Sequence, residues 1–220
     1  MWGTWDNGAT TAPDTGGPTT TTTTVTTTTA PPAAVHTAVA TTCESTAAGQ
    51  TRYNANPTGA TVLAPAGVAQ GSTFQVELTP DPMVVPTSGD GYPISWIANV
   101  AIRFGIPAGT TLVGATLSGG SNLGTGTVTV AQSGAKIVLA VPGQLPAGTT
   151  AVFPKIIATF QATGSAGSTI DTRFSGTSYG DPSMTFQTQV SGVPVLGTVL
   201  STSNCFPDAP NPTLSTTSIG

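Results

Sequence analysis

The stretch Ser95–Pro107, with the sequence SWIANVAIRFGIP, decides the fold of this chain. Apolar side chains recur there at every second position, namely Ala98, Val100, Ile102, Phe104 and Ile106. A period of two predicts a β-strand that turns one face toward a core and the other toward solvent. We expect this strand to end at Pro107, because proline has no N–H to donate to a strand ladder.

Shorter segments on both sides of this strand follow the same alternation. In residues 72–79 the apolar positions are Phe74, Val76 and Leu78, and residues 153–163 and 168–179 repeat the pattern. Clusters of Gly, Pro, Ser and Asn separate the segments, and no apolar period of 3.6 residues is present. Many short strands divided by turn residues predict an all-β, antiparallel sandwich.

Four phrases resemble a known family of modules. They are GVAQGSTFQVELTP, IPAGTTLVGATLSGGSNLGTG, GAKIVLAVPGQLPAGTTAVFP and ATGSAGSTIDTRFSGTSYGDPSMTFQTQV. These phrases are similar to the immunoglobulin-like β-sandwich modules of secreted and cell-surface proteins from high-GC Gram-positive bacteria. The resemblance covers about residues 60–205 and implies an immunoglobulin-like sandwich. It supplies no catalytic residue, and the first 34 residues lie outside it.

The composition favours an extracellular or cell-surface protein. Charged residues make up only 6% of the chain, whereas Gly and Pro number 27 and 19. Hydroxyl and amide groups must therefore cover the surface, which suits secreted or closely assembled proteins. The net charge is −4 and the basic residues are scattered, so we expect no nucleic-acid partner. No run approaches the roughly 20 apolar residues of a membrane span. Met1–Gly8 lacks the features of a signal peptide, so we expect that a leader was removed, that the sequence was trimmed, or that export uses another route.

The two cysteines bracket everything that the pattern predicts to be folded. Cys43 follows the low-complexity N-terminal region, and Cys205 precedes a Pro-rich end. We predict a disulfide between them, which implies an oxidising compartment. The alternative is a pair of unrelated buried thiols.

The first 34 residues have too few apolar side chains to form a core of their own. One interpretation is a solvated stalk with O-linked glycans, for which the candidate sites are Thr19, Thr20, Thr21, Thr22, Thr23, Thr24, Thr26, Thr27, Thr28 and Thr29. The other interpretation is an assembly arm, because Thr favours extended structure and tryptophans commonly anchor interfaces. The candidate anchors of such an arm are Trp2, Trp5, Val25, Val35 and Val39.

The predicted organisation has three parts. Residues 1–34 form a low-complexity Thr/Pro-rich extension, residues 35–205 a single β-sandwich domain, and residues 206–220 a Pro/Ser/Thr-rich C-terminal tail. Residues 35–42 alternate apolar and polar side chains, which predicts either the first strand of the domain or a strand donated to a neighbouring molecule.

No constellation of residues predicts catalysis. The chain has one histidine, His36, without a neighbouring nucleophile, and we assign both cysteines to a bridge. Asp81 and Asp90 share one loop, but a Ca²⁺ site needs six to eight oxygen ligands. We therefore predict no enzyme activity, no metal site and no cofactor. Tyr92 and Trp96 form a candidate sugar-stacking patch, although such a pair more often covers a strand end.

The leading functional hypothesis is a non-enzymatic structural protein, a subunit of a filament or surface assembly. Its partners are further copies of itself, joined through the N-terminal extension by strand addition or by docking in a groove. The second hypothesis is an adhesive or carbohydrate-binding module on an O-glycosylated stalk. The third is a phage decoration or tail protein, against which the predicted disulfide argues.

Overall fold

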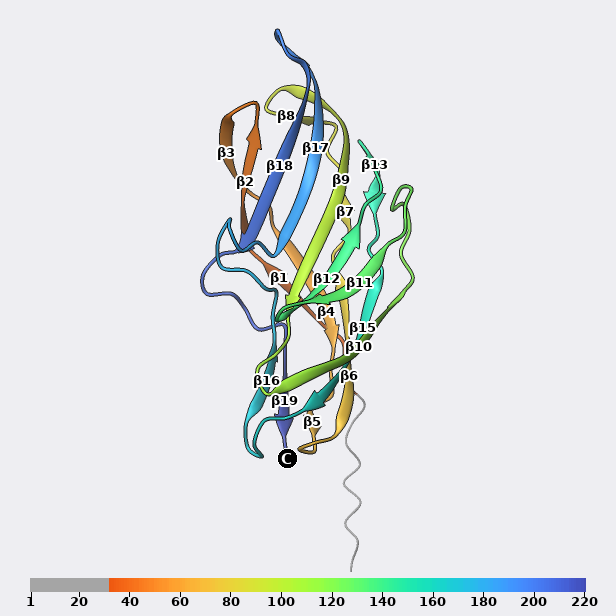
Figure 1. Ribbon diagram of the computed structural model, residues 1–220, viewed down its shortest axis with the longest axis vertical. Coiled ribbons are helices and arrows are strands. Elements are labelled where there is room, and N and C mark those ends of the chain that lie inside the picture. Colours follow the sequence, from red (N-terminus) through yellow and green to blue (C-terminus); the bar gives the residue numbers. More distant parts are fainter. Residues whose placement is uncertain (1–31) are drawn as a thin grey trace, which may run out of the picture. The chain divides into compact units, whose positions relative to one another are not determined.

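The computed structural model describes residues 32–220, and all its regular structure consists of β-strands (Figure 1). Residues 32–220 belong to one compact unit. Two large antiparallel sheets account for most of the strands, so the predicted all-β sandwich is confirmed. The narrower immunoglobulin-like assignment stays a prediction.

Five strands form the first sheet, sheet A, in the spatial order β1-β4-β6-β15-β10. Their bounds are Val35–Val39 (β1), Thr58–Leu63 (β4), Thr73–Pro80 (β6), Lys155–Ala162 (β15) and Thr110–Ser118 (β10). The predicted alternation holds here, since Phe74 lies opposite Phe160 and Val76 opposite Ala158, with all four side chains buried. β1 therefore belongs to its own domain, where it pairs with β4.

Sheet B has nine strands, and its main path runs β11-β12-β9-β17-β18-β2-β3. The bounds along this path are Thr129–Ser133 (β11), Lys136–Val141 (β12), Tyr92–Gly105 (β9), Met184–Val193 (β17), Gly197–Pro207 (β18), Thr41–Ala47 (β2) and Gln50–Ala55 (β3). The short strands Ser88–Gly89 (β8) and Leu145–Pro146 (β13) also pair with β9. β9, the strand predicted from SWIANVAIRFGIP, lies near the middle of this sheet.

The C-terminal residues are part of the fold, which corrects the predicted tail at 206–220. Strand β19, Ser215–Ile219, pairs with Thr169–Thr172 (β16) and runs parallel to Gly67–Val68 (β5). Leu214 and Ile219 are each only 2% exposed. These two apolar side chains dock the segment, although its composition is typical of a solvated tail. Met83–Val84 (β7) and Thr150–Ala151 (β14) form a further small pair.

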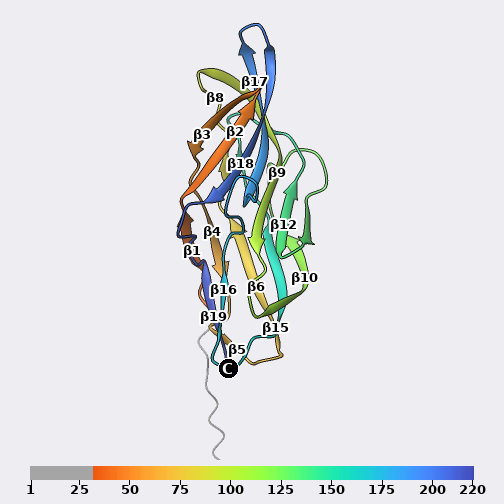
Figure 2. The same ribbon diagram turned by 60° about the vertical axis from the view of Figure 1, so that its left-hand side comes forward.

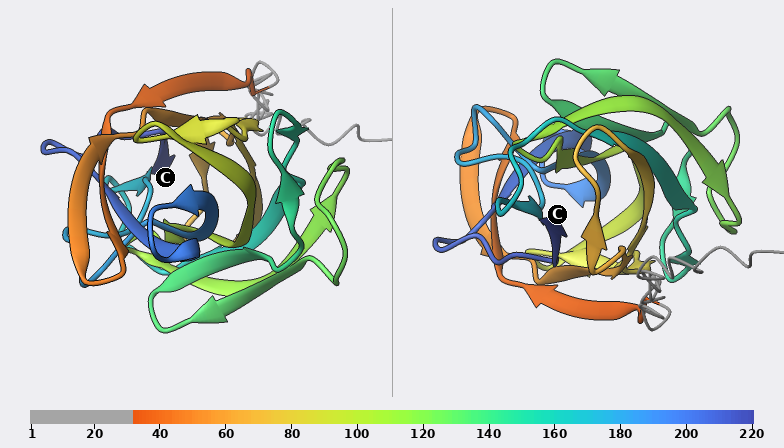
Figure 3. Two further views of the ribbon diagram at one scale, coloured as in Figure 1. Left: turned by 90° about the horizontal axis from the view of Figure 1, so that it is seen from above. Right: turned by 90° about the horizontal axis from the view of Figure 1, so that it is seen from below.

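The core lies between the two sheets, which curve around a shared interior in the views of Figure 3. The predicted inward face of β9 is confirmed, because Val100, Ile102 and Phe104 are at most 4% exposed. Phe104 stacks on Phe174, with ring centroids 4.6 Å apart. Among the described residues, every member of the core cluster lies between Val39 and Ile219.

Candidate functional site

Sheet A does not cover the whole inner face of sheet B. A cavity of about 950 Å³ lies against the uncovered part, and no strand of sheet A contributes a lining residue. The lining comes from β2, β3, β9, β17 and β18, and from the segment 83–90 that crosses in front of them. This is the end of the unit where β2–β3 and β17–β18 form hairpins, shown in Figure 2, and β5 and β19 mark the opposite end.

One wall and the floor of the cavity are built from different side chains. The wall beside β9 and β17 is apolar, with Ile94, Ile97, Phe186 and Val190, to which segment 83–90 adds Met83. Small side chains of β2 and β18 make the floor, and these are Cys43, Ser45, Ala47, Ser201 and Ser203. A large apolar wall over a floor of small residues leaves room for a ligand, and cavities of a few hundred to about 1,000 Å³ are typical of ligand sites.

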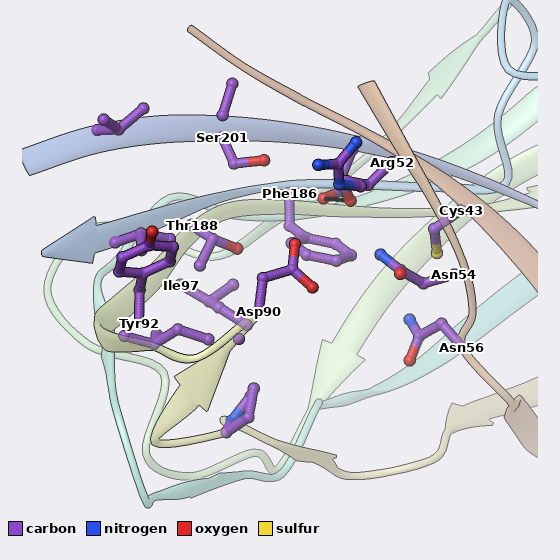
Figure 4. A pocket seen from close by; sticks show the side chains of 18 of the residues that line it. Cys43, Arg52, Asn54, Asn56, Asp90, Tyr92, Ile97, Phe186, Thr188 and Ser201 are labelled. Carbon is purple, nitrogen blue, oxygen red and sulfur yellow. Dashed lines mark hydrogen bonds between the residues drawn. The ribbon is translucent and has the colours of Figure 1, made fainter. Parts of the chain in front are cut away.

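The opposite wall is polar because of the two-residue period of β3. Gln50, Arg52 and Asn54 share the parity that faces the cavity, and Asn56 continues the row. Figure 4 shows Arg52 and both asparagines on this side, with Tyr92 and Ile97 across from them. β3 is also the last strand of sheet B, so the backbone on its outer side has no neighbouring strand within residues 32–220.

Two charged side chains line the cavity, Arg52 and Asp90. Among the described residues Arg52 forms no ion pair, and its guanidinium donates only a long hydrogen bond of 3.4 Å to the Thr51 carbonyl. Asp90 sits in a tight turn before β9, where Asp90 and Gly91 adopt φ angles of 52° and 83°. Such angles are typical of two-residue hairpin turns with the sequence Asp-Gly. Among the described residues, one cation and one anion therefore line the cavity.

The β17–β18 hairpin extends past its neighbours near the cavity. β9 pairs with β17 only as far as Val190, and β2 pairs with β18 only from Ser201 onward. The tip between them is apolar, with Val195 fully exposed and Leu196 55% exposed. Val195 has φ 70°, a left-handed conformation that is strained for a β-branched residue. The strand residues on both sides of this tip, 184–205, include no charged side chain.

Tyr92 and Trp96 do not form one patch, which corrects the predicted sugar-stacking site. Tyr92 lines the cavity, whereas Trp96 lies opposite Gln189. The neighbours of Gln189 in β17 both line the cavity, so Gln189 and Trp96 face the other side of the sheet. The reason is an extra residue in β9 between Ile94 and Trp96, where the register against β17 shifts. A β-bulge of this kind reverses the parity that the sequence predicts.

A cluster of aromatic rings on the outer side of β2 and β3 was missed by the sequence reasoning. The rings of Tyr53 and Tyr179 have centroids 5.5 Å apart, and Tyr179 meets Phe206 edge-on at 4.9 Å. Tyr53 is 62% exposed. Its cross-strand neighbour Glu44 raises the pKa of the Tyr53 phenol, as a hydrogen-bond acceptor and through its negative charge. Thr51, Tyr53 and Ala55 alternate with polar residues, and this alternation was the sequence signal that could have placed Tyr53 on the outer face of a strand.

The other predicted residues have mixed outcomes. Cys43 and Cys205 form the predicted disulfide and are direct partners across β2 and β18. Val39 is 1% exposed in the core of its own domain, so it is not available as an assembly anchor. Val35 is 51% exposed at the start of the edge strand β1. The remaining anchors, Trp2, Trp5 and Val25, and all the candidate glycosylation sites from Thr19 to Thr29 lie outside the described residues.

The groups considered for chemistry lie apart or are engaged elsewhere. The His36 imidazole Nε2 lies 3.0 Å from Asp81 Oδ1, close to Gly59, where a side chain would collide with both. Asp90 lines the cavity instead. Within residues 32–220 no three His, Cys, Asp or Glu side chains lie close enough together to hold a metal ion.

Comparison with known proteins supports the fold alone. No protein family model matches the chain, and no curated protein sequence matches it. One solved structure, a "putative membrane anchored protein from Corynebacterium diphtheriae", is similar with a TM-score of 0.56 and 16% sequence identity. The similarity covers 84% of this chain but only 37% of that one. A search of residues 32–220 found no helix suited to crossing a membrane.

Proposed function

We propose that this chain is a non-enzymatic, extracellular structural protein, a subunit of a filament or other surface assembly. Its N-terminal extension joins it to neighbouring copies. The observation that carries this proposal is the incomplete sandwich, in which part of the inner face of sheet B has no facing strand from sheet A. An added segment completes such a layer by burying apolar surface, which is how strand addition and groove docking work.

Three further features support this assignment. The surface has few charges, so copies of the chain repel one another weakly. The disulfide suits an oxidising, extracellular location, and the solved structure with a similar fold is described as membrane anchored. A non-enzymatic role agrees with the single histidine, which is bonded to Asp81, and with the use of both cysteines in the disulfide.

Deletion of residues 1–34 tests the proposal. The core cluster of the described residues lies within Val39–Ile219, so we expect the shortened chain to keep its strand content by circular dichroism. We expect the full chain to form filaments or oligomers in electron microscopy and light scattering, and the shortened chain to stay monomeric. Assembly by the shortened chain, or a full chain that is monomeric at every concentration, contradicts the proposal.

A carbohydrate-binding or adhesive module is the second candidate, and the aromatic cluster Tyr53–Tyr179–Phe206 favours it. Exposed aromatic rings offer flat apolar faces beside polar groups, and such rings are common at binding surfaces. A glycan array with the wild type and Tyr53→Ala tests this candidate. Trp96→Ala serves as the matched aromatic control, because Trp96 lies on a different strand, outside the cluster. Binding that Tyr53→Ala abolishes and Trp96→Ala retains supports adhesion.

A further inference from the structure

We infer that the cavity at the β2–β3 end receives the segment Trp2–Asp6 from a second copy of this chain. The Trp5 indole packs on the apolar wall that includes Phe186, and the Asp6 carboxylate pairs with Arg52. This inference rests on the proposed function and names the site and the contacts through which it operates.

The size and lining of the cavity suit tryptophan. A volume of about 950 Å³ accommodates a ligand of the size of two indole rings with their connecting residues. The wall of Ile94, Ile97 and Phe186 offers apolar contact, and the small side chains of the floor leave space beneath it. Trp2 and Trp5 are two of the three tryptophans in the chain, and they are the largest apolar side chains of the extension. Buried aromatic anchors of this kind supply much of the energy of many interfaces.

The polar wall suits an extended peptide. Gln50, Arg52 and Asn54 project into the cavity at every second residue, which spaces them about 7 Å apart. An extended backbone presents its N–H and C=O groups on one side with the same repeat. Within residues 32–220, no hydrogen bond to protein occupies the side-chain amides of Gln50, Asn54 and Asn56, which are therefore free to bond such a backbone.

The charges of the cavity set the orientation of the segment. Residues 1–31 have two charged side chains, Asp6 and Asp14, and both are acidic. Arg52 is the one basic residue that lines the cavity, and it has no carboxylate partner among the described residues. Asp90 lines the cavity as well and repels a second carboxylate. Asp6 therefore lies toward β3, and the neighbouring Trp5 lies toward the apolar wall.

The path of the chain favours a second copy over the chain's own extension. β1 and β2 follow each other with only Ala40 between them, and β2 ends at Ala47 beside the cavity. Val35 is thus separated from the cavity by an extended run of up to about 40 Å. The extension of the same molecule would have to fold back along β1 and β2 to reach the cavity, whereas a neighbouring molecule can present its segment directly.

Two cavity substitutions with matched controls test the site in the full chain. Ala47→Trp fills the cavity, and Thr46→Trp places the same ring on the opposite face of β2. Arg52→Glu reverses the charge in the cavity, and Thr51→Glu adds the same charge outside it. We expect both cavity variants to lose assembly in electron microscopy and sedimentation velocity, and both controls to keep it. Arg52→Asp combined with Asp6→Arg should restore assembly.

A direct binding measurement uses a labelled peptide of residues 1–14 and the full chain with Trp2→Ala and Trp5→Ala. We expect saturable binding by fluorescence anisotropy. Removal of the Trp5 indole from the peptide should weaken binding about 30-fold, as for an interface hot spot. Arg52→Glu in the protein should weaken it about tenfold, and Thr51→Glu should leave it unchanged.

Mixing complementary variants shows whether the contact joins two molecules. One variant has an intact extension and the Ala47→Trp cavity, and the other has an intact cavity and lacks both tryptophans. Neither should assemble alone, and an equimolar mixture should form dimers of one copy each. A mixture that stays monomeric, although the peptide binds the cavity, overturns the inference in favour of a contact within one molecule.

The failures of the inference and of the proposed function are distinguishable. If deletion of residues 1–34 abolishes assembly while Ala47→Trp and Arg52→Glu assemble normally, the cavity is not the docking site and the proposed function stands. The extension then docks elsewhere, for which β1 and β3 are candidates because they end their sheets within residues 32–220. If the deletion leaves assembly intact, both fail. Binding of a glycan but not of the peptide in the cavity also overturns the inference.

Discussion

Removing the disulfide should destabilise the domain by several kcal/mol, chiefly through the unfolded chain. The bridge joins Cys43 and Cys205 across a sequence separation of 162 residues. In the chain-entropy model a closed loop of that length restricts the unfolded ensemble by about 5 kcal/mol. We therefore expect the double variant Cys43→Ala/Cys205→Ala to lose about that much free energy of unfolding, at the upper end of the values known for native disulfides.

Equilibrium urea unfolding followed by circular dichroism measures this loss. With a slope of about 2 kcal/mol per molar urea, a change of about 5 kcal/mol lowers the midpoint by roughly 2.5 M. The reduced wild type is the matched control, because it keeps both sulfur atoms in the core and loses only the covalent link. We expect the urea midpoint of the reduced wild type to lie close to that of the double variant.

A reduced wild type within about 1 kcal/mol of the oxidised protein would refute this reasoning, since the model assigns most of the effect to the unfolded chain. If the double variant is far less stable than the reduced protein, the loss of unfolding free energy comes from packing instead, because Cys43 and Cys205 are both almost fully buried.

Four further changes test the packing and electrostatics of the described residues. Phe104→Ala removes a fully buried ring and should cost about 3–5 kcal/mol in urea unfolding. Gly143→Ala places a Cβ against two backbone carbonyl oxygens and should cost about 1–3 kcal/mol in the same assay. Val195→Asn relieves a left-handed φ of 70° and should stabilise the domain by about 1 kcal/mol, seen as a higher Tm. Glu44→Gln should lower the raised pKa of Tyr53, followed by phenolate absorbance against pH with Tyr53→Phe as the blank. Because that pKa is raised in the folded state, its contribution to stability is complete below the ordinary phenol pKa of about 10 and is lost as the pH rises through the folded value.

The sequence predicts those features of the fold that depend on local alternation. The inward faces of β6, β9 and β15 follow from period-two patterns, because one face of each strand must be buried. The disulfide follows from the two cysteines that flank the folded region. The strand faces depend on the pattern within a short segment, and the disulfide depends on the positions of the two cysteines along the sequence.

Other features depend on contacts that no local pattern reveals. The bulges of β9 lie at Ile94–Trp96 and near Asn99, and the first of them separates Tyr92 from Trp96. Asn99 has φ 53°, a conformation that asparagine tolerates better than most residues, but its presence in a strand does not by itself indicate a bulge. The docking of residues 206–220 similarly depends on Leu214 and Ile219, which have no apolar neighbours in sequence that would mark them as core.

The cavity could not be predicted from local patterns in the sequence. The β2–β3 hairpin has exposed polar residues on both faces of β3, so it lacks the alternation that marks the other strands. The turn Ala48-Gly49, with φ angles of 48° and 77°, was its one local signal. The cavity arises because sheet B continues past the end of sheet A, and this difference in extent is a property of the two sheets together.

The disulfide links the redox state of the protein to the structure of the cavity floor. Cys43 is both half of the bridge and part of the cavity floor, and its partner strand β18 supplies Ser201 and Ser203 beside it. In a reducing environment the floor loses its covalent tie, and the two strands that form it are held by backbone pairing and by weaker contacts such as the Ser45–Ser203 hydrogen bond. On the proposed assembly function, oxidation of this pair would therefore set when the cavity floor is rigid enough to dock a second copy.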